Sequence, residues 1–287
     1  MNELESQLVY PLGDTIPAPG SVHQIAPGLR WLRMPLPFAL DHINLWLLDD
    51  EVDGKAGVCT VDCGAGTDAT RAAWEQIFAG PMAQQQLVRV LATHCHPDHV
   101  GLSDWLCQRF DAPFWITTGE YGYARMMAAG LPGVDGSAAI PHFERHGLNA
   151  PEMLAQMAQR RNYYPSLVPA VPLAYTRMRD GQLITIGAHT WRVIAGFGHS
   201  PEHAALYCAE LGILISGDMV LPRISTNVSV FAIEPEGNRC SCTWNRWAAT
   251  TSCLRTPWCC RPTASRFAAC TRASPSCART TRPVWPR

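Results

Sequence analysis

The sequence has no apolar run that approaches the ~20 residues a helix needs to cross a bilayer. Its N-terminal residues, Met1–Ser6, are acidic and lack the basic and apolar regions of a secretory signal peptide. The serine-nucleophile pattern Gly-x-Ser-x-Gly is also missing. These absences predict a cytoplasmic protein without a membrane partner, and they argue against a serine-based covalent mechanism.

Basic residues are scarce in the first 238 positions. Residues 239–287 hold nine of the 23 basic residues and none of the 24 acidic ones, which leaves a net charge of −10 on residues 1–238. A body this acidic, with no basic stripe, argues against a nucleic-acid partner. At 287 residues and 47% hydrophobic content, the chain is long enough to bury one large core or two small ones.

Paired Cys-x-x-Cys spacing is absent as well. Five of the 12 cysteines are scattered through residues 1–238, as in an ordinary reduced cytosolic protein. The other seven crowd residues 239–287, where no histidine accompanies them. A zinc or disulfide module in that segment is therefore disfavoured.

The most informative segment is Thr93–His99, which follows the apolar run Leu87–Ala92, a predicted buried strand. It carries four side chains that commonly bind metals: His94, His96, Asp98 and His99. Neutral imidazole and carboxylate oxygen bind zinc and similar divalent ions at ~2.0–2.2 Å. The first two histidines can point the same way, whereas the aspartate and the last histidine turn toward a neighbouring position. One segment can thus supply two adjacent ions; the alternative is a polar turn with satisfied histidines.

Three further polar residues lie at or near the ends of predicted strands. Asp62 follows the strand 57–61, His199 lies on a glycine-flanked loop after the strand 190–194, and Asp218 ends the apolar strand 212–216. Another strand, 43–48, is expected to end at Asp49 and Asp50, and helices are expected over 67–78 and 99–110. Strands alternating with helices in this way predict a layered α/β arrangement.

In this order, the four blocks resemble those of the metallo-β-lactamase-fold hydrolases, whose signature is His-x-His-x-Asp-His, over about residues 20–238. The resemblance implies an α/β fold, the αββα sandwich, with a C-terminal part that is incomplete or disordered. It implies two metal ions, the first held by His94, His96 and His199 and the second by Asp98 and His99, with Asp218 bridging both. It gives Asp62 a supporting role beside the metals, and the family's last histidine has no match here.

Residues 1–238 are therefore expected to form the catalytic domain, with residues 118–175 contributing a cap or insert. The cap is rich in tyrosine and methionine, which either line an apolar substrate pocket or, as we favour, form helix-packing core: Tyr121, Tyr123, Met126, Met127, Met153, Met157, Tyr163 and Tyr164. His142 and His146 lie here at helical spacing, and without a third ligand nearby we assign them to the surface.

Residues 239–287 do not resemble the rest of the chain. They lose hydrophobic periodicity and nearly all aliphatic residues, and they fill with residues that GC-rich codons give when read out of register. Read one base out of register with permitted codons, the stretch from Pro257 becomes Leu-Val-Leu-Pro-Ser-His-Gly, a strand followed by a histidine. We therefore predict a one-base frameshift near codons 238–239, which removes a ligand from the second metal position.

The expected reaction is hydrolysis of a small acyl compound by a metal-bound hydroxide, with Asp98 helping to orient the nucleophile. The best candidates are a lactone, such as an acyl-homoserine lactone, or a thioester. Two zinc ions are expected, with iron or manganese as alternatives, and a homodimer is allowed. Three other interpretations stay open: a nuclease of this fold, a di-iron oxidoreductase, and a truncated protein that binds metal without activity.

Overall fold

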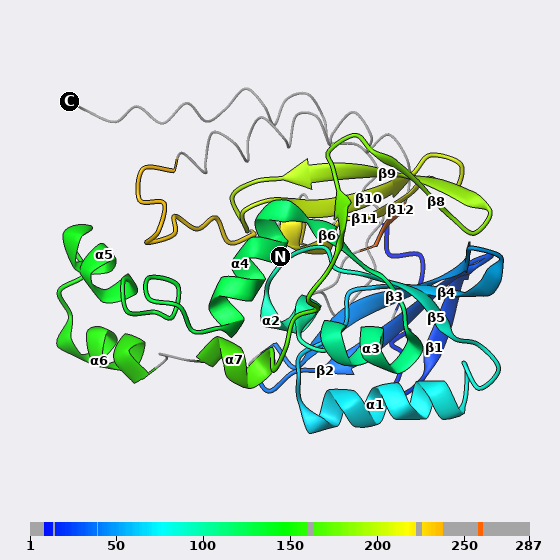
Figure 1. The fold of residues 1–287 in the computed structure, drawn as a ribbon, viewed down its shortest axis with the longest axis horizontal. Helices are drawn as coiled ribbons and strands as arrows, with labels where there is room; N and C mark the ends of the chain where they lie inside the picture. Colours follow the sequence, from blue (N-terminus) through cyan, green and yellow to red (C-terminus); the bar gives the residue numbers. More distant parts are fainter. Residues whose placement is uncertain are drawn as a thin grey trace.

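A computed structural model describes residues 9–13, 15–38, 40–159, 163–221, 226–237 and 258–260. Two β-sheets face each other, and helices cover the outer side of the first sheet (Figure 1). This is the layered α/β arrangement that the sequence predicts. The predicted helical layer over the second sheet, and the side chains of the segment 239–287, lie outside the described residues. Among those described, no helix is both long and apolar enough to cross a membrane.

The first sheet changes from antiparallel to parallel pairing at β4. Its strands follow one another in chain order: β1 (Val22–Ala26), β2 (Leu29–Pro35), β3 (His42–Val52), β4 (Lys55–Val61), β5 (Leu87–Leu91), β6 (Phe114–Thr117) and β7 (Thr176–Met178). The pairs from β1 to β4 are antiparallel, and those from β4 to β7 are parallel. The carboxyl ends of β4, β5 and β6 therefore meet at one edge.

The second sheet is antiparallel except at its end. Its order is β12 (Trp258–Cys260), β11 (Ile213–Ile215), β10 (His203–Cys208), β9 (His189–Gly196) and β8 (Leu183–Ile186). Only the β11–β12 pair is parallel, with Ile213 opposite Trp258. The turn Gly187–Ala188 joins β8 and β9 into a hairpin.

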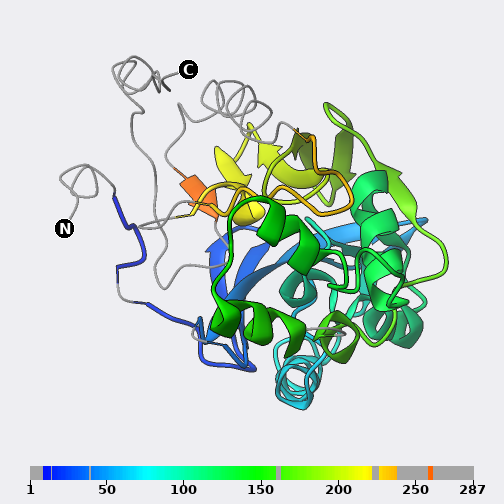
Figure 2. The same ribbon diagram turned by 90° about the vertical axis from the view of Figure 1, so that its left-hand side faces the viewer.

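The helices lie between and beyond these strands: α1 (Asp68–Ala79), α2 (Pro97–Val100), α3 (Ser103–Phe110), α4 (Thr118–Ala128), α5 (Ala139–Arg145), α6 (Pro151–Gln159), α7 (Tyr163–Leu167) and the 3-10 helix η2 (Gly217–Met219). Thr67 caps the start of helix α1, because its side chain accepts a hydrogen bond from the Thr70 amide at 3.2 Å. Turned by 90°, the molecule presents the α4–α7 segment, drawn in green, to the viewer (Figure 2).

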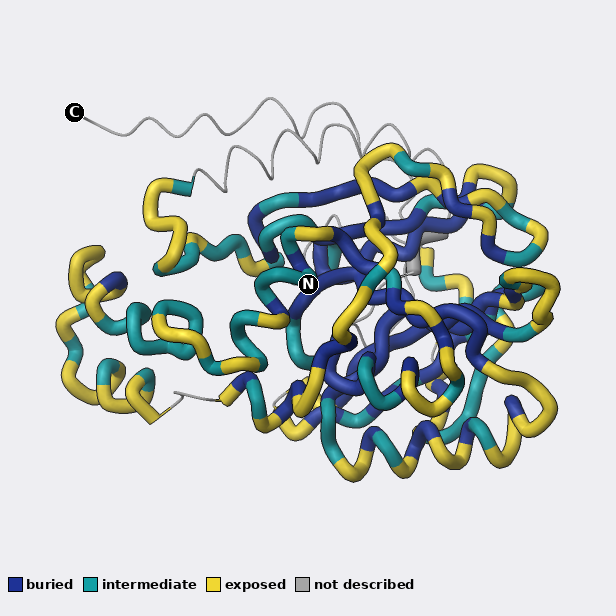
Figure 3. The backbone as a smooth tube through the Cα atoms, in the orientation of Figure 1, coloured by how far each residue is buried: buried dark blue, intermediate teal, exposed yellow. Residues whose placement is uncertain are grey.

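Two apolar cores hold the layers together. One lies between the first sheet and its helices and includes Leu45, Trp74 and Leu106. The other lies between the sheets and includes Trp46 and Trp191. Burial is concentrated in the strands, whereas α5 and α6 are largely half-buried or exposed (Figure 3). Hydrophobic burial of this kind supplies the main driving force for folding.

Two predicted elements have different bounds in the structure. The predicted helix 99–110 is divided into α2 and α3, with Gly101 and Leu102 between them. Strand β3 continues past its predicted end to Val52. It does so because Asp50 is buried and paired: its Oδ2 lies 3.1 Å from Arg89 Nε, and its Oδ1 accepts a hydrogen bond from the Gly187 amide at 3.0 Å. The acidic pair that suggested a strand end is part of the strand.

Candidate metal centre

The predicted ligands converge at one edge of the two sheets. The first sheet supplies Asp62, just after β4, and the segment Thr93–His99, just after β5. The second sheet supplies His199, after β9, and Asp218 in η2, after β11. Residues more than a hundred positions apart are thus brought together. Because each follows the end of a strand, the sheet pairing itself places them at the shared edge.

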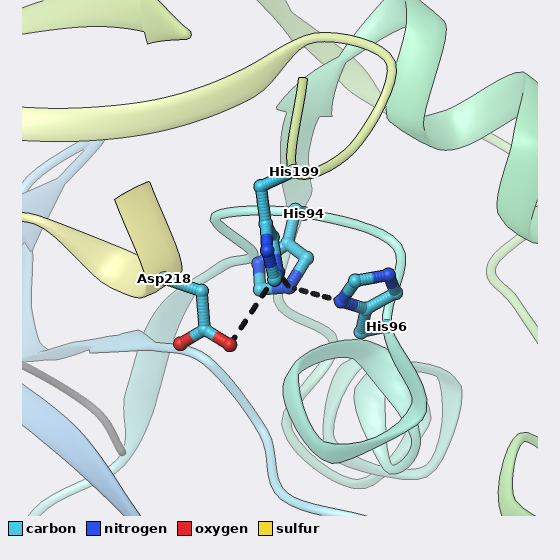
Figure 4. A group of neighbouring side chains, drawn as sticks. All are labelled: His94, His96, His199 and Asp218. Carbon is cyan, nitrogen blue, oxygen red and sulfur yellow. Dashed lines mark hydrogen bonds and ion pairs between the residues drawn. The ribbon is translucent and has the colours of Figure 1, made fainter. Parts of the chain in front are cut away.

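Three imidazoles and one carboxylate form the first group (Figure 4). His94 Nε2 lies 2.8 Å from His96 Nδ1 and 3.2 Å from His199 Nε2. His199 Nε2 in turn lies 3.4 Å from Asp218 Oδ2. One ligand atom from each of the four residues lies within 4.8 Å of the others. This separation suits ligands around a single cation, since each metal–ligand bond is about 2 Å long.

A second group shares Asp218 with the first. His99 Nε2 lies 3.6 Å from Asp98 Oδ2 and 3.6 Å from Asp218 Oδ1. Both His99 Nε2 and Asp218 Oδ1 are buried and have no hydrogen-bond partner among the described residues. An unsatisfied buried polar atom is costly, so two of them facing each other fit a bound cation. The structure therefore brings together all six predicted ligands, and their donor set fits two adjacent ions.

Asp62 contacts the side of the His99 ring that faces away from the predicted ligand atoms. Its Oδ2 lies 2.9 Å from His99 Nδ1, and its Oδ1 accepts hydrogen bonds from Thr93 N at 2.7 Å and Thr93 Oγ1 at 2.9 Å. With Nδ1 donating to Asp62, Nε2 is the nitrogen of His99 that faces the site. This position matches the supporting role that the resemblance implied.

The other imidazoles are oriented in a similar way. His94 Nδ1 lies 3.0 Å from Thr93 Oγ1. His199 Nδ1 lies 3.1 Å from the Asn227 carbonyl oxygen, which can only accept a hydrogen bond. In both rings the Nδ1 contact leaves Nε2 for the site. Thr93 and Asn227 carry no metal-binding pattern in the sequence, so sequence reasoning missed them.

His203 lies beside the site, and its Nε2 contacts the backbone of the bridging aspartate. That nitrogen accepts a hydrogen bond from the Asp218 amide at 3.1 Å, and the His203 ring lies 4.7 Å from that of His94. Gly217 makes this approach possible, because its φ is +48° and an added Cβ would lie 2.3 Å from His203 Nε2. His203 thus fixes the position of Asp218.

The two groups differ in protonation. Burial lowers the pKa of His94 well below its usual value, with repulsion from the neighbouring histidines adding to it. Burial also lowers the pKa of His96 to about 3. Burial acts against the charged form of His99 too, but its pKa is raised well above the usual value by three carboxylates: Asp62, Asp98 and Asp218. His94 and His96 are thus neutral, the form that binds metal, whereas His99 favours its protonated form and would release the Nε2 proton to a bound cation.

Glu120 joins the two ligand-bearing loops and was not predicted. It is fully buried in the first turn of α4. Its Oε2 accepts a hydrogen bond from the Cys95 amide at 2.8 Å, and its Oε1 accepts bonds from Ser200 Oγ at 2.6 Å and the Glu202 amide at 2.5 Å. One carboxylate thus connects the loop of His94 and His96 with the loop of His199.

The tyrosines and methionines of residues 118–175 divide between core and cavity. Tyr121 and Tyr123 pack against the core, as favoured, whereas Met153 on α6 is 52% exposed. A cavity of about 290 Å³ beside His96 is lined by others of the set: Met127, Tyr163 and Tyr164. Met127 also contacts the core.

The surface assignment of His142 is wrong, because that residue is 8% exposed. It lies on α5, which packs against α6, and its ring centroid lies 4.6 Å from that of the exposed His146. Within the described residues, these two rings are not part of any group of three metal-type ligands.

Fold and site together define a two-sheet sandwich with a candidate metal centre at its edge. Residues 40–250 match the family model of the metallo-beta-lactamase superfamily. Since this match covers most of the chain, the protein belongs to that superfamily, and the predicted family and fold are confirmed.

Relatives of the chain support the same assignment. The probable metallo-hydrolase YqjP of Bacillus subtilis (strain 168) is 26% identical over 211 residues, 68% of this chain and 58% of YqjP. The chain thus spans little more than half the length of that relative. A solved beta-lactamase domain protein from Burkholderia ambifaria is 49% identical with a TM-score of 0.84, covering 93% of this chain and 76% of that one. A metallo-beta-lactamase family protein from Thermus thermophilus is 26% identical with a TM-score of 0.69, covering 86% and 76%.

Proposed function

We propose that this protein is a metal-dependent hydrolase with a two-ion centre that cleaves a small acyl compound, a lactone of the acyl-homoserine type or a thioester. The observation that carries the proposal is the convergence of three imidazoles on one point with Asp218 shared by a second group. Zinc suits this set of nitrogen and oxygen donors, and iron or manganese also binds such ligands. When bound, two such ions lower the pKa of water toward ~7 and polarise a carbonyl oxygen.

The residues of the chain have distinct parts in this reaction. His94, His96 and His199 would hold the first ion through ring nitrogens. In His94 and His199 the opposite nitrogen, Nδ1, already has a hydrogen-bonding partner, and burial keeps His96 neutral by lowering its pKa to about 3. Asp218 connects the two positions. Asp98 is half-buried and lies 3.6 Å from His99 Nε2. Its carboxylate would hold the second ion together with His99 and help to orient the attacking water.

The acyl substrate is supported by the surroundings of the centre. The cavity beside His96 is lined mainly by apolar side chains, which suits the uncharged part of an acyl compound. The superfamily assignment and the similarity to a probable metallo-hydrolase favour hydrolysis. Because the chain covers only part of that relative, the choice of substrate is our own proposal.

Elemental analysis of the purified protein, combined with a panel of lactones and thioesters, tests the proposal. We expect zinc, or iron or manganese, and hydrolysis that is lost in His94→Ala. The matched control is His146→Ala, an exposed histidine outside the centre, which should keep both metal and activity. Metal without turnover of any acyl substrate would instead identify a binding protein. Cleavage of nucleic acid at low salt, or redox-active iron, would replace the proposed reaction with another.

A further inference from the structure

A small apolar cavity opens directly beside the candidate metal centre. Its volume is about 290 Å³, at the small end of the ~300–1,000 Å³ range of ligand pockets. His96 contributes to its wall and to the metal centre alike. The remaining wall comes from the end of α4, the following turn and α7, whose side chains include Met127, Val134, Tyr163 and Tyr164. These elements lie next to one another in Figure 1.

The wall is anchored to the metal-binding loop. Tyr164 is 6% exposed, and its hydroxyl donates a hydrogen bond to the Cys95 carbonyl oxygen at 2.5 Å. Because that hydroxyl is occupied, the ring of Tyr164 contributes an apolar surface. The Tyr163 ring lies 6.1 Å from that of Phe38, which connects α7 to the loop after β2. The cavity therefore has a fixed position relative to His94 and His96.

The cavity also has little charge. Among the described residues that line it, Asp135 alone has a charged side chain, and its Oδ1 accepts a hydrogen bond from the Ser137 amide at 2.8 Å. Burying an ionised group in such a site without a partner is costly. An anionic acyl group is thus disfavoured, whereas an uncharged apolar one gains from burial.

We propose that this cavity is the specificity pocket for the acyl group, and that it selects an uncharged aliphatic acyl chain of short to medium length. The inference rests on the proposed hydrolase function and names its substrate class. Each added methylene should raise kcat/KM about fourfold until the cavity is full, after which longer chains gain nothing or lose.

The variant that tests the pocket is Val134→Trp, which fills it from the turn after α4. Leu131→Trp is the matched control, because Leu131 lies on the same turn, is 46% exposed and is not part of the cavity wall. Across lactones or thioesters from acetyl to decanoyl, Val134→Trp should lose about tenfold or more of kcat/KM for hexanoyl and octanoyl substrates. Acetyl substrates should change little, and Leu131→Trp should behave as wild type throughout.

Binding of unreactive amides separates this inference from the proposed reaction. The series from acetamide to decanamide is titrated into the metal-loaded wild type and both variants, after unfolding curves have shown that each is folded. Wild type and Leu131→Trp should bind hexanamide and octanamide more tightly than acetamide, and Val134→Trp should not. If acyl substrates are not hydrolysed but this binding pattern appears, the acyl pocket is supported and the proposed hydrolase reaction is rejected. Equal dependence on chain length in all three proteins would overturn the pocket.

Discussion

At the scale of single residues, the candidate centre depends on groups that lie behind the ligands. Asp62 accepts hydrogen bonds from Thr93 and His99 at the same time and is 1% exposed. A carboxylate behind a metal-binding imidazole fixes the ring and raises its basicity. The same residue has a positive φ of 69°, a conformation that costs energy for aspartate and persists only when its surroundings hold it.

Replacing Asp62 with asparagine should lower the metal affinity of the second position by roughly 10–100-fold. The amide removes the negative charge opposite His99 and places an N–H group against the donors of Thr93. Competition with a chelator, followed by elemental analysis, measures the loss. Asp104→Asn on α3 is the control, since Asp104 bonds only to the Gln108 side chain in an exposed position. Equal metal content in both variants would contradict the role given to Asp62.

The two metal positions should respond differently to pH. Protons compete with metal only below the pKa of a ligand. Burial is the main cause that lowers the pKa of His94 well below its usual value and the pKa of His96 to about 3, so protons should not compete with metal for these two ligands of the first position between about pH 7.5 and pH 5.5. The pKa of His99 is raised by its carboxylate neighbours, so the second ion must displace a proton. Its affinity should fall by about tenfold for each unit of decreasing pH below that raised pKa.

Zinc titrations by calorimetry at several pH values check this expectation. Two binding steps should be seen at high pH, and the weaker step should disappear first on acidification. The variant His99→Gln should keep a single step with a flat pH profile. A first step that weakens as steeply as the second would show that burial does not keep His96 neutral.

At the scale of secondary-structure elements, helix α4 connects the two sheets' ligand loops. Besides the hydrogen bonds of Glu120, the Thr117 hydroxyl donates to the Glu202 carbonyl oxygen at 2.7 Å, and the Gly119 amide donates to Glu202 Oε2 at 2.8 Å. Burial raises the pKa of Glu120, while its hydrogen-bond donors oppose that shift. The start of α4 thus holds the loop of His199 against the loop of His94.

The variant Glu120→Gln should lose on the order of 2 kcal/mol of unfolding free energy, because its amide nitrogen would face a donor in a buried site. The first metal position should weaken by about tenfold, since two of its histidines lie on one loop and the third on the other. Denaturant unfolding and chelator competition measure the two effects. Glu75→Gln is the matched control: its side chain is 50% exposed and pairs with Arg109, so it should change stability by less than ~1 kcal/mol. If Glu120→Gln bound metal as tightly as wild type, Glu120 would not be needed to hold the two ligand-bearing loops together.

The sequence predicted the strands that consist of apolar runs and the metal-type residues whose spacing resembles the family signature. It missed β1 and β7, which have few buried residues and weak alternation. The break between α2 and α3 was also missed, because its apolar residues suit one continuous helix. The sequence did not mark Glu120 as a functional residue. Acidic residues are common in the first turn of a helix, because the helix dipole favours negative charge there. Only the packing of α4 on the second sheet's loops reveals its role.

At the scale of the whole molecule, the order of the sheets bears on the predicted frameshift. The backbone of Trp258–Cys260 forms β12, parallel to β11, whose end leads into Asp218. In the alternative reading frame, this stretch becomes Leu-Val-Leu and a histidine follows three residues later. If the alternative frame also forms a parallel strand at this place, that histidine should lie at the edge where the metal centre lies.

We predict that a protein with residues 239–287 translated in the alternative frame binds two zinc ions tightly, whereas the present chain binds the second only weakly. Elemental analysis of both proteins after identical dialysis measures the difference. The DNA of the gene gives an independent check, because its actual bases must encode the histidine across the codons of Pro262 and Thr263. If they do not, or if both proteins hold equal metal, the frameshift hypothesis is wrong.

The position of the candidate metal centre between the two sheets has a consequence for the stability of the protein. The histidines on one loop come from the first half of the chain, and His199 and Asp218 come from the second. Ions bound there would hold together two halves that also meet through an apolar interior and through the hydrogen bonds of Glu120. By mass action, the melting temperature should climb with free zinc and drop when a chelator is added. A cell short of metal would then lose this protein to proteolysis sooner than one well supplied.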